Sequence, residues 1–483
     1  MRDLNCNSAC DAVYKEVVVI GNGPSALGLS YMLAGHLPYY NGLPHPTDDM
    51  LTARLQAIST TRPLFTQDLE FLSQGLEGRS TNPVSVLMDH LTHPAADLGL
   101  DTPPLVEWRP HPDSAVDHIV LGKGPPGGAW QAMDGNVLTI SLSSWMELPG
   151  LEFRRWEMLH NGGTSTTVRR VPVASVAAYY RDYVRLMRLG KYLRNNVVVT
   201  SVRRLPPLNL NKDCSCASAQ WSVEGYDTET HKPFSYVCRS VVMATGSTDQ
   251  PNRLCVPGEM DNTSWVFHDL AAFEKALAQF VKDNPGIKDG SRSVDPVCVV
   301  GAGLSAADAV LACRFHSVPL IHVFRRSGIS PEHALPENMY PEYHKVREMM
   351  NAGGRGYAGY EAYPHHRVTH IASDSHKVSI SSPSGHQSVL QASLMVILIG
   401  SRPDLSFLPA EFHDGQTLAV DPEQPLDCRS NPLAVDPWTH KVLGVGEGVY
   451  AAGPLVGDNF VRFLLGGATA ITGDLHRRRK QTT

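Results

Sequence analysis

The stretch GNGPSA, residues 21–26, has the spacing of a loop that binds the pyrophosphate of a dinucleotide. Gly21 would make the tight turn, Gly23 would let phosphates approach the backbone, and Ala26 would let a helix pack closely on the preceding strand. An apolar strand at 16–20 precedes the loop and an apolar-faced helix follows it, as the motif requires. The helix N-terminus would point free N–H groups at the phosphates. We expect cofactor contacts from Gly21, Gly23, Pro24, Ser25 and Ala26.

The stretch GAGLSA, residues 301–306, repeats this pattern in a compact strand–helix–strand unit. Its second strand, residues 320–324, ends in Arg325 and Arg326. Two guanidinium groups match the 2′-phosphate of NADP in charge and fork geometry, whereas a carboxylate would repel it. The pair therefore favours NADPH over NADH, with two solvated arginines as the alternative interpretation. In the loop itself, we expect cofactor contacts from Gly301, Gly303, Ser305 and Ala306.

Two dinucleotide loops in one chain are typical of an enzyme in which FAD takes hydride from a nicotinamide. We expect FAD on the first loop and NADPH on the second. The expected fold is α/β, with two dinucleotide-binding (Rossmann-like) domains and the NADPH domain inserted into a discontinuous FAD domain. The expected segments are a disordered N-terminus (1–11), the first FAD segment (12–260), the NADPH domain (261–399) and the second FAD segment (400–483).

The first unit departs from its pattern in two ways. A helical insertion at about 41–115 separates the first helix from the second strand, and it would cover the flavin or substrate, or serve as a docking surface. The second strand, 118–121, should end in an acid that holds the adenosine ribose, but Gly122 and Lys123 follow it. Losing that hydrogen bond should weaken FAD binding by about 1.5–3 kcal/mol. Gly122→Glu tests this interpretation: if it does not tighten FAD binding, either another group does the work of the acid or the strand is misplaced. Lys123 would either reach the pyrophosphate or face solvent.

A predicted helix over residues 459–471 follows a buried strand, and its N-terminal end would aim at the flavin ring. The helix dipole there favours negative charge on reduced flavin. Asp458 and Asn459 are the polar candidates for flavin contact. Arg462 would pair with an anionic group, or is a surface arginine. The basic end at 476–480 is interpreted as a solvated helix terminus.

Composition narrows the remaining classes of protein. The 483 residues carry a net charge of −6 with 42% hydrophobic residues, which is ordinary for a globular chain of several domains and gives no broad nucleic-acid-binding surface. No apolar run approaches the length of a membrane span, and the N-terminus lacks a signal-peptide core. The nine scattered cysteines fit a reducing, cytoplasmic compartment and suggest neither a metal cluster nor a disulfide reductase.

Further blocks resemble the flavin-containing monooxygenases and their Baeyer–Villiger and ornithine N-hydroxylating relatives. GGAW at 127–130 is similar to their G-G-x-W, and ATG at 244–246 resembles their narrow crossover between domains. By resemblance, His268 ends a nucleotide fingerprint and is a catalytic candidate together with Asn459 and Arg462, although a structural histidine is the alternative. The resemblance implies cofactor contacts from Gly127, Gly128, Trp130, Ala244, Thr245, Gly246 and Gly453, and it places Ser143, Ser144 and Trp145 near the flavin.

Nearly the whole chain resembles the oxidative stress-induced growth inhibitor family, most clearly in HIVLGKGPPGGAW, YPEYHKVREMM and GDNFVRFLLGGA. The resemblance implies an FAD- and NADPH-dependent monooxygenase linked to growth restraint, cell death and cytokinesis. Its partners would be molecular oxygen and a small-molecule or protein substrate, and its location would be cytoplasmic with midbody association. Two alternatives remain open. One is a non-catalytic regulator that binds a protein partner, and the other is an NADPH oxidase that releases hydrogen peroxide.

Overall fold

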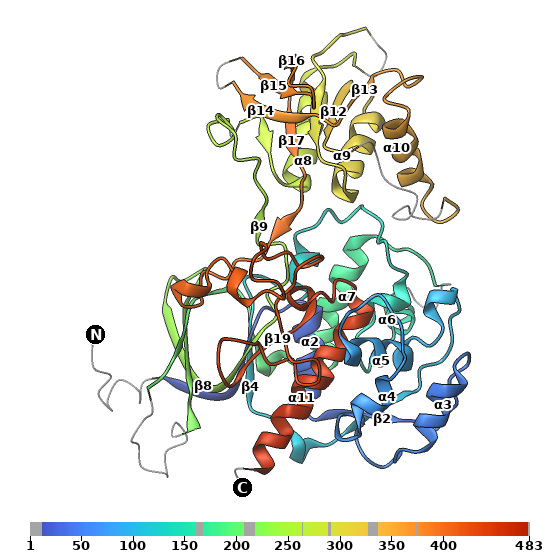
Figure 1. Ribbon diagram of the computed structural model, residues 1–483, viewed down its shortest axis with the longest axis vertical. Coiled ribbons are helices and arrows are strands. Elements are labelled where there is room, and N and C mark those ends of the chain that lie inside the picture. Colours follow the sequence, from blue (N-terminus) through green and yellow to red (C-terminus); the bar gives the residue numbers. More distant parts are fainter. Residues whose placement is uncertain are drawn as a thin grey trace. The chain divides into compact units, whose positions relative to one another are not determined.

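The structure, a computed structural model, describes residues 12–160, 168–206, 218–262, 264–287, 291–326, 337–372 and 375–481. The predicted N-terminal segment 1–11 lies outside these residues. Contacts divide the chain into a first unit, Met1–Asp249 with Pro403–Thr483, and a second unit, Gln250–Arg402 (Figure 1). Each unit is built on parallel strands with a strand–glycine loop–helix start, so the predicted α/β dinucleotide-binding fold class is confirmed.

The first unit contains a seven-stranded sheet in which parallel strands position the first glycine loop. Strand β1 lies between β4 and β8 and pairs in parallel with both. The long strand β8 also pairs in parallel with the late strand β19 and antiparallel with β7, which joins β6. The strands are β1 (Val13–Ile20), β4 (His118–Leu121), β5 (Leu193–Arg194), β6 (Val197–Arg204), β7 (Trp221–Asp227), β8 (Pro233–Met243) and β19 (Val449–Ala451).

The insertion after the first helix is part of the core of the first unit. Strands β2 (His36–Tyr40) and β3 (Val106–Pro110) pair antiparallel at its two ends. Between them lie α3 (Asp49–Gln56), α4 (Leu69–Ser73) and α5 (Pro83–Thr92), the first two capped by Asp48 and Asp68. Buried side chains of the insertion, such as Leu51 and Leu87, share one apolar cluster with Val17 of β1 and Ile471 near the C-terminus.

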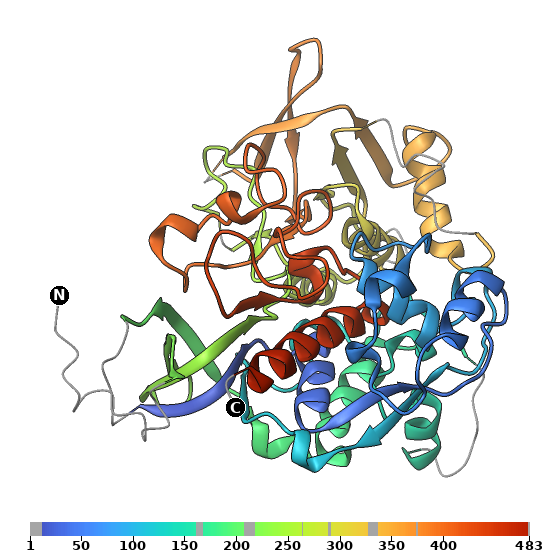
Figure 2. The same ribbon diagram turned by 60° about the horizontal axis from the view of Figure 1, so that its bottom comes forward.

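Helix α11 (Leu464–Lys480) packs between α2 (Pro24–Leu33) and the insertion, as Figure 2 shows with α11 in red. Small residues permit this approach. A Cβ added to Gly466 would lie 2.2 Å from the backbone of Ser85 in α5, and Gly28 of α2 faces Leu465. The insertion therefore holds the helix that was expected to face the flavin, although α11 begins at Leu464 and not at residue 459 as predicted.

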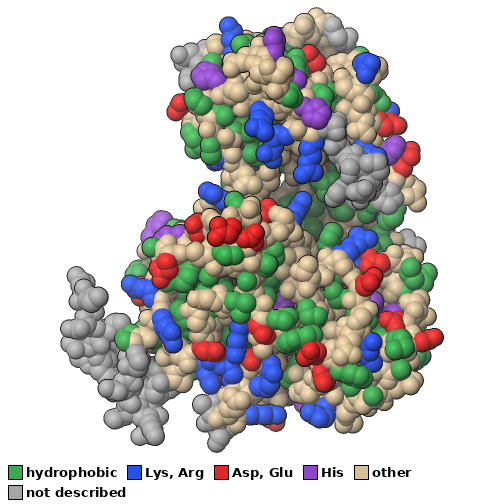
Figure 3. All heavy atoms as spheres, in the orientation of Figure 1, with side chains coloured by type: hydrophobic (Ala, Val, Ile, Leu, Met, Phe, Trp, Pro, Cys, Tyr) green, Lys and Arg blue, Asp and Glu red, His purple; other side chains and the backbone are tan. Residues whose placement is uncertain are grey.

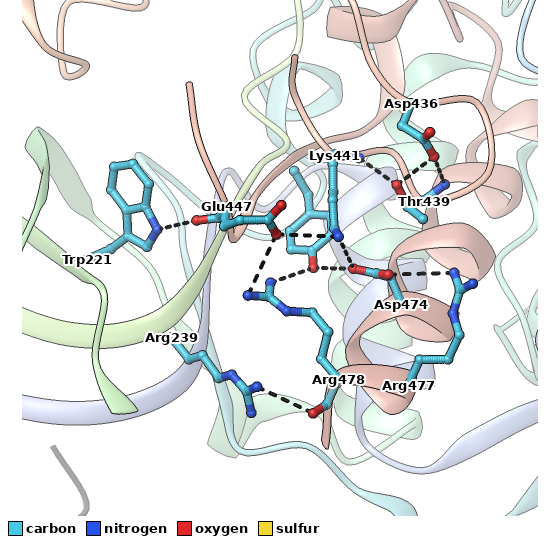
Figure 4. A network of polar contacts seen from close by, with 10 residues as sticks. Trp221, Arg239, Asp436, Thr439, Lys441, Glu447, Asp474, Arg477 and Arg478 are labelled. Carbon is cyan, nitrogen blue, oxygen red and sulfur yellow. Dashed lines mark hydrogen bonds and ion pairs between the residues drawn. The ribbon is translucent and has the colours of Figure 1, made fainter. Parts of the chain in front are cut away.

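The basic end of α11 is docked on the protein at Arg478, whereas Arg477 and Lys480 are exposed, as the interpretation of a solvated terminus expects. Asp474 accepts a hydrogen bond from the buried Tyr450 hydroxyl at 2.7 Å and pairs with Lys441 at 3.3 Å. Arg478 donates to the same hydroxyl at 3.0 Å and lies 4.0 Å from Glu447, which also pairs with Lys441 (Figure 4). This network fixes α11 against the loop that precedes β19.

The second unit has a parallel sheet of order β10-β17-β11-β12-β13. Helices α8 (Leu270–Asp283), α9 (Leu304–Phe315) and α10 (Pro341–Asn351) belong to it, and β14 (Arg367–Ile371), β15 (Lys377–Ser381) and β16 (Gln387–Gln391) form a separate antiparallel sheet. A short pair, β9 (Gln250–Pro251) with β18 (Ser401–Arg402), joins the two ends of the unit. The parallel strands are β10 (Val266–Phe267), β11 (Val297–Val300), β12 (Leu320–Phe324), β13 (Tyr360–Pro364) and β17 (Met395–Ile397).

No described helix has the length and apolar character to cross a bilayer, and no described group of histidine, cysteine and acidic residues has a metal-binding arrangement. On the face shown in Figure 3, acidic and basic side chains are interspersed over each unit.

Candidate functional site

The first glycine loop has the geometry that phosphate binding requires. Gly21 adopts φ +104°, and a Cβ there would lie 2.2 Å from the Ala244 carbonyl oxygen, so only glycine fits. Gly23 caps α2 without any side-chain hydrogen bond, and a Cβ at Gly23 would meet nothing within 4 Å. The first N–H groups of α2 therefore open onto unfilled space, as an anion site needs.

Two segments, at Ala244–Thr245 and at Gly453, lie against this loop. Ala244 and Thr245 lie under Gly21, and the Thr245 hydroxyl is buried with no partner among the described residues. Gly453, at the end of β19, has φ +72° and would place a Cβ 2.2 Å from the Ser25 hydroxyl. A buried hydroxyl without a partner beside open helix N–H groups fits the phosphate and ribityl part of a flavin dinucleotide.

The GGAW segment is fixed to the first loop through its backbone. The Gly127 N–H donates to the Asn22 carbonyl oxygen at 2.9 Å, and a Cβ on Gly128 would lie 3.0 Å from the Gly23 Cα. Trp130 lies edge-on to the buried Tyr180, with ring centroids 6.2 Å apart. The structure thus brings together four of the segments that the sequence proposed for FAD: 21–26, 127–130, 244–246 and the turn at Gly453.

The position of the missing ribose acid is filled by Asn22. A Cβ on Gly122 would lie 2.0 Å from Asn22 Nδ2 and 2.1 Å from its Cγ. Gly122→Glu would therefore collide with Asn22, so this change alone should not tighten FAD binding. Lys123 does not face solvent unpaired but forms an ion pair with Asp249 at 2.7 Å.

Asp458 is fully buried and is used to hold the insertion, so the structure does not place its carboxylate on a flavin. Its Oδ1 accepts hydrogen bonds from Ser80 at 2.5 Å and Asn82 at 3.2 Å, and its Oδ2 accepts one from Ser85 at 2.8 Å. Burial raises the pKa of Asp458 to about 6 despite these three donors. The neighbouring Asn459 is exposed, and its Nδ2 donates to the carbonyl oxygens of Cys428 and Gly457.

Arg462 is buried, which corrects the alternative of a surface arginine. Its guanidinium pairs with Asp89 at 3.2 Å and with Asp97 at 2.8 Å, and it lies 4.7 Å from the ring centroid of Trp145. Burial raises the pKa of Asp89 to about 7 and lowers that of His93, one helical turn away, to about 4. The anionic partners of Arg462 are thus carboxylates of the insertion.

The predicted pocket residues Ser143, Ser144 and Trp145 lie in a short 3₁₀ turn beside this cluster. The Ser144 carbonyl oxygen lies 3.3 Å from His93 Nε2, and Trp145 stacks its ring on Arg462 while it packs against an apolar cluster. Both the pocket and the packing interpretations of Trp145 remain compatible with these contacts.

The second glycine loop repeats the geometry of the first in its own unit. Gly301 has φ +133° with its missing Cβ 2.2 Å from the Leu398 carbonyl oxygen, and Gly303 caps α9 with nothing within 4 Å. The Gly301 carbonyl oxygen accepts a hydrogen bond from the buried His322 Nε2 at 2.7 Å. Arg325 and Arg326 are exposed, and within the described ranges neither has a hydrogen bond or ion pair.

His268 lies in the second unit as half of a partly buried hydrogen-bonded pair. Its Nε2 is 2.9 Å from Glu259 Oε1, and Glu259 also accepts hydrogen bonds from the N–H groups of Leu254 and Cys255. Burial lowers the pKa of His268, although Glu259 opposes that shift. This geometry favours the interpretation of His268 as a structural histidine, because the side chain connects the loop after β9 to the end of β10.

The sequence predicted individual site residues, but it did not predict several of the residues that contact them. Asn22 and Asn195 at the first loop, Asp89 and Asp97 beside Arg462, and Glu259 beside His268 were not predicted. One signal was available for Asn22: a large polar side chain within a glycine loop coincides with a missing acid on the adjacent strand.

Comparisons with known proteins agree with this arrangement. The sequence model of the family described as "Pyridine nucleotide-disulphide oxidoreductase" matches residues 191–424. The chain is 41% identical to human "Oxidative stress-induced growth inhibitor 2" over 96% of this chain and 94% of that protein, and 41% identical to mouse "Oxidative stress-induced growth inhibitor 1" over 96% and 95%.

Among solved structures, the chain resembles a bacillithiol disulfide reductase from Bacillus cereus, with TM-score 0.58 and 16% identity over 96% of this chain and 99% of that one. It also resembles an ornithine hydroxylase from Pseudomonas aeruginosa, with TM-score 0.54 and 13% identity over 97% and 100%. At these identities the likeness establishes the fold alone.

Proposed function

The chain belongs to the oxidative stress-induced growth inhibitor family, and we propose that it is an FAD- and NADPH-dependent monooxygenase. The observation that carries the proposal is the repeated loop geometry. Each unit has an enforced glycine turn and a helix N-terminus that opens onto free space. The second adds two exposed arginines that have no hydrogen bond or ion pair among the described residues. One chain thereby offers one site for each of two dinucleotides.

FAD would lie on the first loop. The N–H groups at the start of α2 would hold its pyrophosphate, and the buried hydroxyl of Thr245 would gain the partner that it lacks. The glycines at 127, 128 and 453 leave room for close approach. The chemistry that FAD supplies when bound is acceptance of hydride from NADPH and activation of oxygen.

NADPH would lie on the second loop, with its 2′-phosphate between Arg325 and Arg326. The hydrogen bond from His322 to the Gly301 carbonyl oxygen holds this loop in its binding conformation before the cofactor arrives. The predicted contacts from Gly303, Ser305 and Ala306 remain part of the proposal. The oxygen acceptor would be a small molecule or a protein side chain.

The proposed catalytic contacts differ in how the structure supports them. Asn459 is exposed and, in the described chain, its amide oxygen has no hydrogen-bond partner, so it remains a candidate for flavin contact. Arg462 would act indirectly, because its guanidinium is committed to Asp89 and Asp97 at the start of α11. For His268 we retain a catalytic role only through the Nδ1 that Glu259 leaves free.

Growth restraint under oxidative stress is proposed from the names of the relatives, together with the roles in cell death and cytokinesis that the family resemblance implied. The cytoplasmic and midbody locations have the same basis. A non-catalytic regulator with a protein partner is the second candidate, because the carboxylate of Asp458 is used to hold the insertion rather than a ligand.

Spectra of the purified full-length protein test the proposal. We expect flavin absorbance after reconstitution with FAD, and loss of that absorbance when NADPH is added without oxygen. If FAD produces neither a bound-flavin spectrum nor a rise in melting temperature, the enzyme proposal fails and the regulator is favoured. If the reduced protein releases stoichiometric hydrogen peroxide with every acceptor tried, the monooxygenase is replaced by an oxidase.

A further inference from the structure

Position 122 requires glycine because the Asn22 side chain occupies the space of a Cβ atom, and not because of its backbone conformation. Its torsion angles are open to any residue, and its N–H and C=O groups make ordinary sheet-like bonds to Arg194 and Val197. The obstruction is the Asn22 amide group, whose three terminal atoms would all lie within 2.7 Å of an added Cβ. The two positions are therefore complementary: a side chain at 122 and an asparagine at 22 exclude each other.

The Asn22 amide is held in a single orientation. Its Nδ2 donates to the Gly124 carbonyl oxygen at 2.6 Å and to Asn195 Oδ1 at 3.0 Å. A carbonyl oxygen only accepts, so Nδ2 must face Gly124, and both of its hydrogens are used. Asn22 Oδ1 is left without a hydrogen bond from any described residue, although the side chain as a whole is 3% exposed.

We propose that Asn22 replaces the missing acid, with its amide oxygen accepting the hydrogen bond of an adenosine ribose hydroxyl. The inference rests on the proposed binding of FAD to the first loop. The Asn22 side chain lies against Gly122 at the end of β4, where the side chain of that acid would begin, and its backbone carbonyl oxygen accepts a hydrogen bond from Gly127 of the GGAW segment. Asn22 therefore joins the phosphate loop, the ribose position and the GGAW segment.

An asparagine amide in place of a carboxylate changes the strength of the hydrogen bond to the ribose. A carboxylate accepts the hydroxyl hydrogen bond with a full charge, whereas an amide oxygen accepts it as a neutral group and forms the weaker bond. We expect this chain to distinguish FAD from an analogue that lacks both adenosine ribose hydroxyls by about three- to tenfold in affinity. The acid-containing pattern would give a larger ratio.

The first experiment measures the dissociation constants of FAD and of this dideoxy analogue by quenching of flavin fluorescence, using the full-length protein. Wild type should prefer FAD, and Asn22→Ala should bind both ligands equally. Asn195→Ala is the matched control, because it removes a neighbour of the amide but leaves the acceptor oxygen. It should keep the preference for FAD. Equal binding of both ligands by wild type overturns the inference but leaves FAD binding intact.

The second experiment exchanges the two residues. Gly122→Glu alone should lose FAD and melt at a lower temperature, because the glutamate collides with Asn22. Asn22→Gly with Gly122→Glu should restore binding and exceed wild type in its preference for FAD over the analogue, since a carboxylate again faces the ribose. If the double variant binds no better than Gly122→Glu, the complementarity is wrong. If wild type binds no FAD at all, the proposed function fails instead.

Discussion

The two glycine loops have the same backbone conformation and differ in the residues that surround them. In each, the first glycine rests on a carbonyl oxygen of a strand end, Ala244 or Leu398, and the second caps a helix with open space in front. The loop residues Asn22 and Ser25 are buried under other segments, whereas Gly303, Leu304 and Ser305 are exposed. A loop enclosed by its own unit suits a cofactor that stays bound, and an open loop suits one that must leave after each turnover.

The difference extends to the groups at the end of the second strand. The first unit has a glycine there, with the Asn22 amide in the space that a side chain would occupy, and the second has two exposed arginines. The proposed FAD site would therefore bind through packing and neutral hydrogen bonds, and the proposed NADPH site through charge. Salt should weaken the second site much more than the first, because screening acts on exposed charges.

The largest expected effect separates the turn glycine from the phosphate glycine. Gly21→Ala forces a positive φ on alanine and drives its Cβ into the Ala244 carbonyl oxygen, which should destabilise the first unit by about 2–6 kcal/mol. Gly23→Ala meets nothing in the unliganded fold, so it should leave the melting temperature unchanged while FAD binding is lost. Thermal melting with and without FAD checks both. Equal melting temperatures for the two variants would contradict the enforced turn.

The next prediction concerns acid stability, to which one buried histidine of each unit should contribute by a similar amount. His118 in β4 and His322 in β12 are buried, and burial lowers the pKa of each to about 4. Because the folded pKa lies below the unfolded value, stability is full above about pH 6.5 and falls as the pH drops towards 4. Each histidine should account for about 3 kcal/mol of that loss.

Urea unfolding between pH 7 and 4 measures this effect. His322→Phe should flatten the profile of the second unit and also weaken NADPH binding, because the Gly301 carbonyl oxygen loses its donor. His118→Phe should make the profile of the first unit less steep but not flat, because the buried His93 and His440 keep the rest of its slope. FAD affinity should stay nearly unchanged, since His118 contacts Ser30 of α2 and not the loop. Profiles as steep as that of wild type would show that these histidines are not neutral in the folded protein.

The glycine loops and the arginines were predictable because each is a local signal. A strand, a loop and a helix follow one another within about 30 residues, so spacing alone reveals them. The partners of Asp458 and Arg462 were not predictable, because Ser80, Ser85, Asp89 and Asp97 lie in the insertion, hundreds of residues away in the chain. Which of many polar side chains meets a buried charge depends on tertiary packing, and no periodicity encodes that.

A third prediction tests the charged site of the second unit. Arg325→Ala with Arg326→Ala should raise the KM for NADPH by about ten- to a hundredfold, because two charge-assisted hydrogen bonds to the 2′-phosphate are lost. The KM for NADH and the affinity for FAD should hardly change. Steady-state oxidation of both nucleotides by the FAD-loaded protein gives the comparison. Equal increases for NADPH and NADH would remove the 2′-phosphate assignment.

The smallest expected effect decides what Lys123 does beside the first loop. Its ammonium group pairs with Asp249, its side chain is 58% exposed, and Asp249 also accepts the N–H of Asp404 at the return of the chain into the first unit. An exposed pair of this kind contributes up to about 1 kcal/mol. Lys123→Ala should therefore weaken FAD binding less than about threefold, and Asp249→Asn should have the same small effect.

If Lys123 instead reached the pyrophosphate, its loss would weaken FAD binding by about tenfold or more, whereas Asp249→Asn would not. Titration of both variants with FAD separates these two roles of Lys123: an ion pair that holds the first unit together, or a direct contact with phosphate. Only the first role leaves the proposed FAD site without a charged side chain, in contrast to the proposed NADPH site.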